Sequence, residues 1–375
     1  MNSSHSDSVH PKHFLGKIEF FFNGVLDDVS VNEALCKKNI LIDVRTKLEY
    51  VKGSIPEALN YPLFDNLERA EIGVIYKRIG KKAAFEKGLE FFTPRIEKFL
   101  SSIANLKTKH LVVFCARGGM RSASVVKLLQ HNGFEAVQLQ GGYKKYRSYV
   151  LEKLKGPVPP LIVLHGQTGV GKTLLLKKLP DHLDLEEFAG HRSSLFGAIN
   201  KIPQTQKNFE AVLVKNILEL ANKKHVFIEG ESRKVGKVFI PQAIAEAMKY
   251  GTLVLLQASI DTRIRRIVEE YKISDDHTYL QTDSILQSMQ QVIGKKKSEL
   301  LRQWLKKGDF EKIVHVLLEE YYDPRYQYAM RMNEYALKLS AENLNSAAEE
   351  LLQFQSGLIN SRENIQQKNQ NSKLN

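Results

Sequence analysis

Short runs of apolar residues recur along the chain, separated by longer segments whose apolar residues lie three or four positions apart. The runs are residues 40–45, 111–114, 136–139, 161–164, 226–229 and 253–256. Runs of this length are typical of buried strands, and the longer spacing is typical of amphipathic helices. Strands that alternate with helices in this way predict parallel sheets joined by crossovers, and therefore an α/β fold.

The chain is too long for a single ordinary core. At 375 residues it predicts two domains with a helical appendage. A linker is expected where Gly156, Pro157, Pro159 and Pro160 cluster. The predicted organisation is a disordered N-terminus over residues 1–18, a first α/β domain over 19–150, a linker over 151–160, a second α/β domain over 161–270, a helical region over 271–352 and a disordered tail over 353–375.

The balance of charge favours a polyanionic partner. The formal net charge is +13 and the isoelectric point is about 9.4. Basic residues gather at positions 77–82, 144–147, 263–266, 295–297 and 306–307. Each group alone is more typical of a solvated face, but their sum favours nucleic acid as the partner.

Cysteine usage and hydropathy favour the cytoplasm. The two cysteines, Cys36 and Cys115, exclude a disulfide scaffold and suggest a compartment where thiols stay reduced. No Cys/His cluster has the spacing of a zinc site. The polar N-terminus lacks a signal peptide's apolar segment, and no apolar run approaches the ~20 residues that span a bilayer. We therefore expect a cytoplasmic protein with no membrane partner.

One cysteine lies where a reactive thiol is expected. Cys115 follows the strand at 111–114 and precedes a segment with the spacing of a helix, so free backbone N–H groups and the helix dipole should lower its pKa. Glycines in the intervening loop let the backbone curl closely, and arginines add charge-assisted hydrogen bonds. The predicted anion-binding loop consists of Arg117, Gly118, Gly119, Arg121 and Ser122. Cys115 is therefore our candidate nucleophile.

A second candidate centre is a phosphate-binding loop. The sequence Gly-Gln-Thr-Gly-Val-Gly-Lys-Thr fits the P-loop pattern in full and lies between a buried strand and a helix. Its glycines would turn successive N–H groups towards a phosphate, its lysine would supply a positive charge and its threonine a hydroxyl suited to Mg²⁺. The predicted diphosphate-binding residues are Gly166, Gly169, Gly171, Lys172 and Thr173. The pattern recognises a di- or triphosphate and names no base.

Two carboxylates end the strand at 226–229. Such strands in P-loop folds often carry an acid that orients Mg²⁺, so Glu229 and Glu231, with Arg233 beyond them, are predicted to support the site. The alternative is that these charges only end a strand. No metal ligand is assigned from the sequence.

Several motifs of the first domain resemble a rhodanese domain. They are Ile-Asp-Val-Arg at 42–45, Gly-Ser-Ile-Pro-Glu-Ala-Leu-Asn at 53–60, the cysteine loop, and Gly-Gly-Tyr at 141–143. The resemblance implies that Asp43 and Arg45 support the thiol. Five residues separate Cys115 from Arg121, which is longer than in common sulfurtransferases and similar to the Cys-x5-Arg loops of phosphatases that enclose a phosphate.

The combination of both centres resembles the bacterial tRNA 2-selenouridine synthases. His-Arg-Ser-Ser at 191–194, Glu-Gly-Glu-Ser-Arg at 229–233 and Glu-Glu-Tyr-Tyr-Asp-Pro at 319–324 add to it, and it extends over residues 41–328. The resemblance implies an enzyme, a transferase, that replaces sulfur of 2-thiouridine at the wobble position of tRNA with selenium. Geranyl diphosphate would first geranylate the sulfur, and selenophosphate would then supply selenium.

Within that resemblance each centre has an implied role. Cys115 would carry selenium and the P-loop would hold the diphosphate, with Mg²⁺ a reasonable companion. Selenophosphate and geranyl diphosphate are the implied co-substrates, and tRNA and the selenophosphate-producing enzyme are the implied partners.

Three other classes compete with this interpretation. A rhodanese-type sulfurtransferase or a Cys-x5-Arg phosphatase with an ATP-binding regulatory domain would use the first centre for chemistry. A nucleotide kinase or ATPase would use only the second. A non-catalytic RNA-binding module would need neither, and substitution of Cys115 would then leave its function intact.

Overall fold

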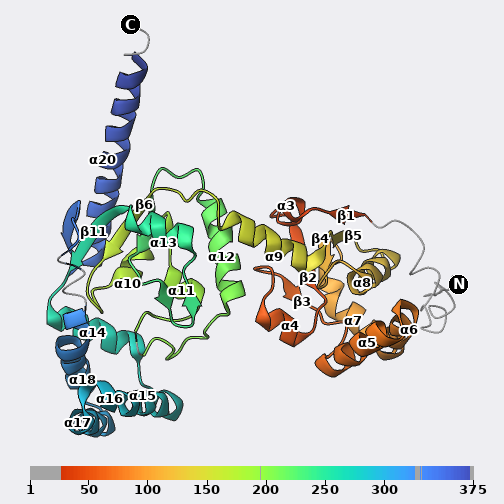
Figure 1. The fold of residues 1–375 in the computed structure, drawn as a ribbon, viewed down its shortest axis with the longest axis horizontal. Coiled ribbons are helices and arrows are strands. Elements are labelled where there is room, and N and C mark those ends of the chain that lie inside the picture. Colours follow the sequence, from red (N-terminus) through yellow and green to blue (C-terminus); the bar gives the residue numbers. More distant parts are fainter. Residues whose placement is uncertain (1–26, 195, 326–329, 331, 372–375) are drawn as a thin grey trace, which may run out of the picture. The chain divides into compact units, whose positions relative to one another are not determined.

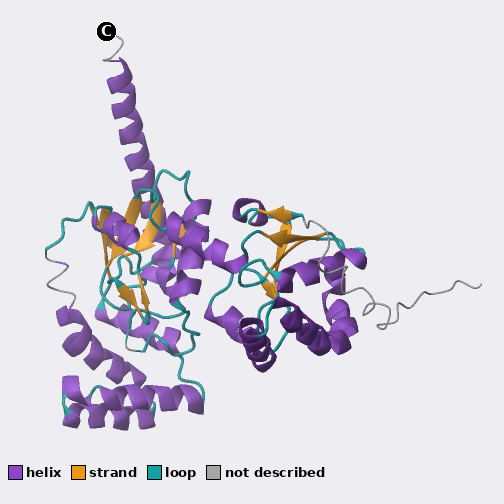
Figure 2. Ribbon diagram, turned by 45° about the vertical axis from the view of Figure 1, so that its right-hand side comes forward, coloured by secondary structure: helices purple, strands orange, loops and turns teal. Residues whose placement is uncertain are grey.

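The chain folds into two compact units in a computed structural model, which describes residues 27–194, 196–325, 330 and 332–371. The first unit comprises residues 1–153 and the second residues 154–375 (Figure 1). The predicted disordered segment 1–18 lies outside the described residues. Figure 2 shows that the strands of each unit gather in a sheet with helices around it, which confirms the predicted α/β class.

The sheet of the first unit is parallel throughout, in the order β1-β5-β4-β2-β3. Its strands are β1 (Asp28–Val29), β2 (Asn39–Asp43), β3 (Leu59–Asn60), β4 (His110–Phe114) and β5 (Ala136–Leu139). The apolar runs at 40–45, 111–114 and 136–139 therefore form the three inner strands. Ile42, Val113 and Phe114 are wholly buried, as expected of parallel strands covered on both faces.

Seven α-helices in the described part of the first unit complete its layers. They are α3 (Val31–Ala34), α4 (Lys47–Lys52), α5 (Asn66–Arg78), α6 (Lys81–Phe92), α7 (Ile96–Ile103), α8 (Met120–His131) and α9 (Gly142–Lys153), with 3-10 turns η1 (Thr93–Arg95) and η2 (Ala104–Leu106). Helix α9 continues to Lys153, so the predicted linker at 151–160 begins too early. Val150 of α9 is fully buried, and the helix contacts α3 of the same unit.

The second unit has a second parallel sheet, in the order β12-β11-β6-β8-β7. Its strands are β6 (Leu161–His165), β7 (His182–Leu183), β8 (Val226–Glu229), β11 (Thr252–Gln257) and β12 (Leu337–Ser340), and a separate hairpin joins β9 (Lys234–Val235) to β10 (Val238–Phe239). The helices are α10 (Lys172–Leu176), α11 (Leu185–Ala189), α12 (Gln206–Glu219), α13 (Gln242–Lys249), α14 (Ile260–Tyr271), α15 (Asp276–Ser288), α16 (Gln290–Ile293), α17 (Lys295–Lys307), α18 (Phe310–Leu317), the π-helix η3 (Leu318–Tyr322) and α20 (Leu344–Asn371).

Two predictions about the C-terminal third need correction. The region predicted as helical, 271–352, contains β12, which pairs with β11 because Leu339 belongs in the core of the P-loop sheet. The tail predicted to be disordered, 353–375, is helical as far as Asn371. Phe354 and Leu358 pack against the same core cluster, so the first turns of this tail have an apolar surface to bury.

Candidate active sites

Cys115 lies at the carboxyl end of β4, where the chain turns into α8. Its side chain is buried, with 4% of its surface exposed. The sulfur accepts hydrogen bonds from the Ser122 hydroxyl at 3.2 Å and from the Gly119 backbone N–H at 3.4 Å. Two residues of the predicted loop, Gly119 and Ser122, therefore donate to this sulfur.

The surroundings of Cys115 favour its thiolate. Burial by itself would raise the pKa of the thiol, but the charge of Arg121 and hydrogen bonds from Ser122 and from the Arg117 and Ser122 backbones outweigh it, so the pKa lies below its usual value. A thiol with a lowered pKa is the form expected of a nucleophile near neutral pH.

The two arginines of the loop differ in position. Arg121 is held by Glu49, whose carboxylate accepts hydrogen bonds of 2.9 and 3.3 Å from both ends of the guanidinium. Glu49 also closes the capping box of α4 with Thr46, which fixes the carboxylate that orients the arginine. Arg117 is exposed. Glu49 was missed in the sequence because it lies 72 positions from Arg121.

Two glycines allow the thiol loop to pass close to the start of α9. Gly118 and Gly142 have φ angles of 63° and 55°, which favour glycine. A Cβ atom on Gly142 would lie 2.4 Å from the Cys115 carbonyl oxygen and 2.5 Å from the Gly118 nitrogen. The Tyr143 N–H donates to that same carbonyl at 2.9 Å. The motif at 141–143 therefore anchors the backbone that presents the sulfur.

Asp43 and Arg45 brace this unit and make no hydrogen bond to the sulfur among the described contacts. Both are buried, and Arg45 donates to Asp43 and to the Gly53 carbonyl at 2.8 Å. Ser54 donates to Asp43 at 2.7 Å. The Arg45 guanidinium also lies 4.0 Å from the centre of the Tyr143 ring. This network joins the end of β2 to the loop at 53–54 and to α9.

The predicted phosphate loop connects β6 to α10. Gly169 and Gly171 adopt φ angles of 79° and 97°, and a Cβ atom on Gly169 would lie 2.6 Å from the Ile267 side chain. Lys172 folds back over the loop and donates to the Gly166 carbonyl at 3.2 Å. Gly169, Gly171, Lys172 and Thr173 line one cavity, which suits an anion-binding loop.

Two arginines of α14 hold the phosphate loop in place, and the sequence analysis missed this role. Arg263 donates to the Thr168 carbonyl at 2.9 Å and forms a double hydrogen bond with Asp323, at 2.9 and 2.6 Å. Arg266 donates to the Val170 carbonyl at 2.8 Å. The expectation of a solvated basic face at 263–266 is wrong for these two, since both side chains are buried. Their spacing of three residues, which puts both on one helix face, was the available signal.

Three carboxylates, one from α11 and two from the end of β8 and the loop after it, lie close together near Thr173. Potential ligand oxygens of Glu186, Glu229 and Glu231 lie within 4.8 Å of one another, and the Thr173 hydroxyl donates to Glu186 at 3.2 Å and to Glu229 at 3.3 Å. Burial and the neighbouring carboxylates raise the pKa of Glu229 well above its usual value. Burial also raises the pKa of Glu231, to about 7.

The remaining predicted residues divide between the cavity and the surface. Arg192, Ser193 and Ser194 of the loop at 191–194 line the phosphate cavity. Ser193 donates its backbone N–H to Glu186. Arg233 is exposed and borders a different hollow, so the structure does not bring it to the phosphate loop.

These features define a two-domain enzyme class, with a thiol centre on a rhodanese-like unit and an anion centre on a P-loop unit. Residues 30–149 match the model of the rhodanese-like domain, and residues 159–356 match that of the tRNA 2-selenouridine synthase AAA domain. The second match spans more than half of the chain. The chain belongs to the tRNA 2-selenouridine synthase family, and the expectation of a transferase is confirmed at that level.

Relatives of the same name cover most of the chain. The tRNA 2-selenouridine synthase of Hydrogenovibrio crunogenus is 32% identical over 82% of this chain and 94% of its own length. That of Sulfurovum sp. is 31% identical over 78% of this chain and 89% of its own. The crystallised N-terminal domain of a Clostridium difficile 630 protein whose title is ATP/GTP binding protein is 42% identical over 33% of this chain and 99% of its own, with a TM-score of 0.33.

Among the described residues, no helix combines the length and the apolar character needed to cross a bilayer.

Proposed function

We propose that this protein replaces the sulfur of 2-thiouridine at the wobble position of tRNA with selenium, through an S-geranyl intermediate. The observation that carries the proposal is the presence of two anion centres of different chemistry on one chain of this family. One holds a buried thiol with a lowered pKa, and the other a complete phosphate loop. Each suits one leaving group, phosphate at the first and diphosphate at the second.

The first step uses the P-loop unit. The sulfur of 2-thiouridine attacks C1 of geranyl diphosphate, the C1–O bond breaks with its electron pair going to diphosphate, and the base loses its N3 proton to solvent. Lys172 and the loop N–H groups offset the charge that develops on the diphosphate. Because these donors are already ordered, they stabilise the leaving group without reorganisation.

A magnesium ion suits the acidic side of this cavity. Thr173 and the carboxylates Glu186, Glu229 and Glu231 supply hard oxygen ligands, which Mg²⁺ prefers. Burial and the neighbouring carboxylates raise the pKa values of Glu229 and Glu231, and a bound cation would favour their charged forms. Bound there, Mg²⁺ would neutralise charge on the diphosphate.

The second step uses Cys115 to handle selenophosphate. Selenium in selenophosphate is at the selenide level, so a Cys115–selenium bond would require a two-electron oxidant. Attack of the thiolate on phosphorus balances without one: the P–Se bond breaks, selenide leaves with the electron pair, and water later hydrolyses the S–P bond. Selenide then adds to C2 of the geranylated base and geranyl thiolate leaves. This assignment replaces the predicted role of Cys115 as the carrier of selenium with that of a phosphoryl carrier.

The substrate and setting follow from the same proposal. The net charge of +13 suits binding of tRNA, whose phosphates attract basic surfaces. We further propose a cytoplasmic location and supply of selenophosphate by the enzyme that makes it.

The test is nucleoside mass spectrometry of tRNA bearing 2-thiouridine, incubated with the purified protein. Geranyl diphosphate alone should give S-geranyl-2-thiouridine, and addition of selenophosphate should give 2-selenouridine. Selenouridine formed at full rate without geranyl diphosphate would overturn the two-step route. Intact-protein mass spectrometry of Cys115 then separates a phosphoryl adduct from one with the isotope pattern of selenium.

A further inference from the structure

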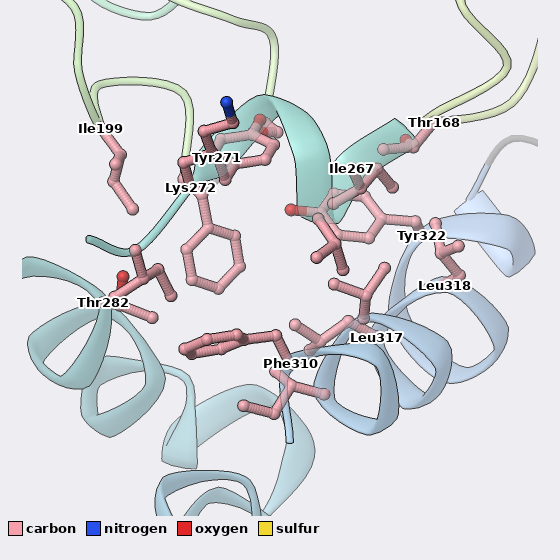
Figure 3. Close-up of a pocket in the computed structure, with 16 residues that line it drawn as sticks. Thr168, Ile199, Ile267, Tyr271, Lys272, Thr282, Phe310, Leu317, Leu318 and Tyr322 are labelled. Atoms are coloured by element: carbon pink, nitrogen blue, oxygen red, sulfur yellow. The ribbon is translucent and has the colours of Figure 1, made fainter. Parts of the chain in front are cut away.

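An apolar pocket lies among the helices that follow the P-loop sheet (Figure 3). Side chains of α14, α15, α18 and η3 form its walls, including Ile267, Phe310 and Leu317. Its free space is about 670 Å³ with the open mouth included. Because the pocket is open to solvent on one side, a slender ligand can enter it.

This pocket adjoins the phosphate cavity. Thr168, Ser194, Ile267 and Tyr271 line both spaces. Thr168 belongs to the phosphate loop itself, and the Tyr271 and Ser194 hydroxyls lie 2.6 Å apart in a hydrogen bond. If the phosphate groups of a ligand bind the phosphate loop, the rest of that ligand therefore lies beside an apolar pocket.

The polar atoms of the pocket are few and largely engaged, which disfavours a nucleotide base there. Tyr271 and Ser194 bond to each other, and the Thr282 hydroxyl donates to the Thr278 carbonyl at 2.8 Å. Lys272 is exposed. A purine would leave its ring nitrogens without partners in such a pocket, whereas a hydrocarbon loses nothing.

A π-helical turn forms one wall of the pocket. Leu318–Tyr322 form a π-helical turn, a wider and rarer form that often occurs at functional sites. Leu317, Leu318 and Tyr322 line the pocket. The next residue, Asp323, accepts a hydrogen bond from the guanidinium of Arg263. The turn thus couples one wall of the pocket to the arginine that also holds the phosphate loop.

We propose that this pocket binds the hydrocarbon chain of an isoprenyl diphosphate whose diphosphate lies on the phosphate loop. The inference rests on the proposed function, because it locates the geranyl chain of the first step. Ser194 also lines a third hollow, bordered by Lys234, Lys237 and Arg325. Ser194 therefore lies where the apolar pocket, the phosphate cavity and the third hollow meet. C1 of the ligand would lie near Ser194, and a nucleoside that enters through the basic third hollow would reach C1 there.

Val314→Trp tests the assignment by filling the pocket from a partly buried position on α18. Titration calorimetry with Mg²⁺ and without tRNA would compare geranyl diphosphate with inorganic diphosphate. Geranyl diphosphate should bind wild type far more tightly than dimethylallyl diphosphate, on the order of a hundredfold for five further carbons, most of them buried. Val314→Trp should remove most of that preference and leave inorganic diphosphate affinity unchanged.

Two further variants keep the test decisive. Val292→Trp places the same bulk at a valine that is 58% exposed and outside the pocket, and should bind like wild type. Val314→Ala adds no bulk and should weaken geranyl diphosphate binding roughly fivefold, which covers the case in which the tryptophan variant fails to fold.

The possible results distinguish failure of the pocket assignment from failure of the proposed function. Unchanged geranyl diphosphate affinity in both Val314 variants, with tight Lys172-dependent binding in wild type, would refute the pocket and spare the proposed function. Wild type that binds geranyl diphosphate no better than inorganic diphosphate would refute both. If ATP competes tightly with geranyl diphosphate in wild type and Val314→Trp abolishes that competition, the pocket binds a nucleotide and the inference is overturned.

Discussion

The two anion centres share one local design and differ in what holds it in place. Each lies in a loop between a buried parallel strand and the N-terminus of a helix, where free N–H groups favour an anion. The thiol centre carries its nucleophile and a cation, Arg121, within one loop. The phosphate loop is held by Arg263 and Arg266, nearly a hundred positions away. The donors to the Cys115 sulfur are thus local, whereas carbonyls of the phosphate loop are held by side chains of a distant helix.

The carboxylates of the two centres also differ. In the thiol unit Glu49 pairs with Arg121, so its charge is neutralised. In the P-loop unit Glu229 and Glu231 crowd together, and their pKa values are raised. The carboxylate of the first centre is thus paired with a cation, whereas burial and mutual repulsion favour the protonated forms of the carboxylates in the second.

Loss of the thiol should have the largest effect. Cys115→Ser should abolish selenouridine formation, because a serine hydroxyl stays protonated near neutral pH. Geranylated tRNA should accumulate when geranyl diphosphate is supplied. Nucleoside mass spectrometry measures both products, with Cys36→Ser as the control because Cys36 is exposed and lies in no anion-binding loop. Formation of selenouridine by Cys115→Ser at the wild-type rate would contradict the assignment of Cys115 as the nucleophile.

Loss of the P-loop lysine should slow geranylation much more than selenation. Lys172→Ala should slow geranylation by on the order of a hundredfold, the typical cost of one preorganised donor. Selenation of tRNA that is already geranylated should largely survive. Single-turnover rates of each step with purified substrates provide the measurement. Equal loss of both steps, with normal tRNA binding, would show that the phosphate loop serves both.

Breaking the brace of the phosphate loop should test the role of distant residues. Arg263→Met leaves Asp323 without its partner, and losing one member of a buried ion pair costs about 3 kcal/mol or more. Thermal unfolding of the second unit should shift to lower temperature. Lys312→Met, which breaks a surface pair with Asp309 in the same unit, is the control and should change little. An unaltered transition in Arg263→Met would contradict the bracing role.

The smallest expected effect concerns the pH dependence of the thiol. Arg121 lowers the pKa of Cys115, so Arg121→Gln should move the midpoint of iodoacetamide alkylation to higher pH. Ser122 and the backbone donors remain, so part of the lowering should persist. Rates should fall below the midpoint and converge at high pH, where both variants are thiolates. The measurement belongs in a Cys36→Ser background, with Arg121→Lys retaining the charge. A midpoint unmoved in Arg121→Gln would exclude the electrostatic role.

Local pattern determined much of this protein. The apolar runs, the cysteine loop and the phosphate loop each lie within a dozen residues, and such segments express their strand, turn and helix preferences directly. The sheets, both loops and the family follow from them. The glycines at 141–143 were also visible as a motif, although the reason for Gly142, the backbone of Cys115 pressed against it, was not.

Only the tertiary structure decided which distant residues complete the sites. Glu49 meets Arg121, Arg263 meets Thr168, and Glu186 joins Glu229 because parallel strands and their crossovers bring far segments to one sheet edge. The strand at Leu337–Ser340 likewise exists through its pairing with β11. Charge and hydropathy along the chain do not specify such partners, because an arginine has the same local pattern on a solvated face as beneath a phosphate loop.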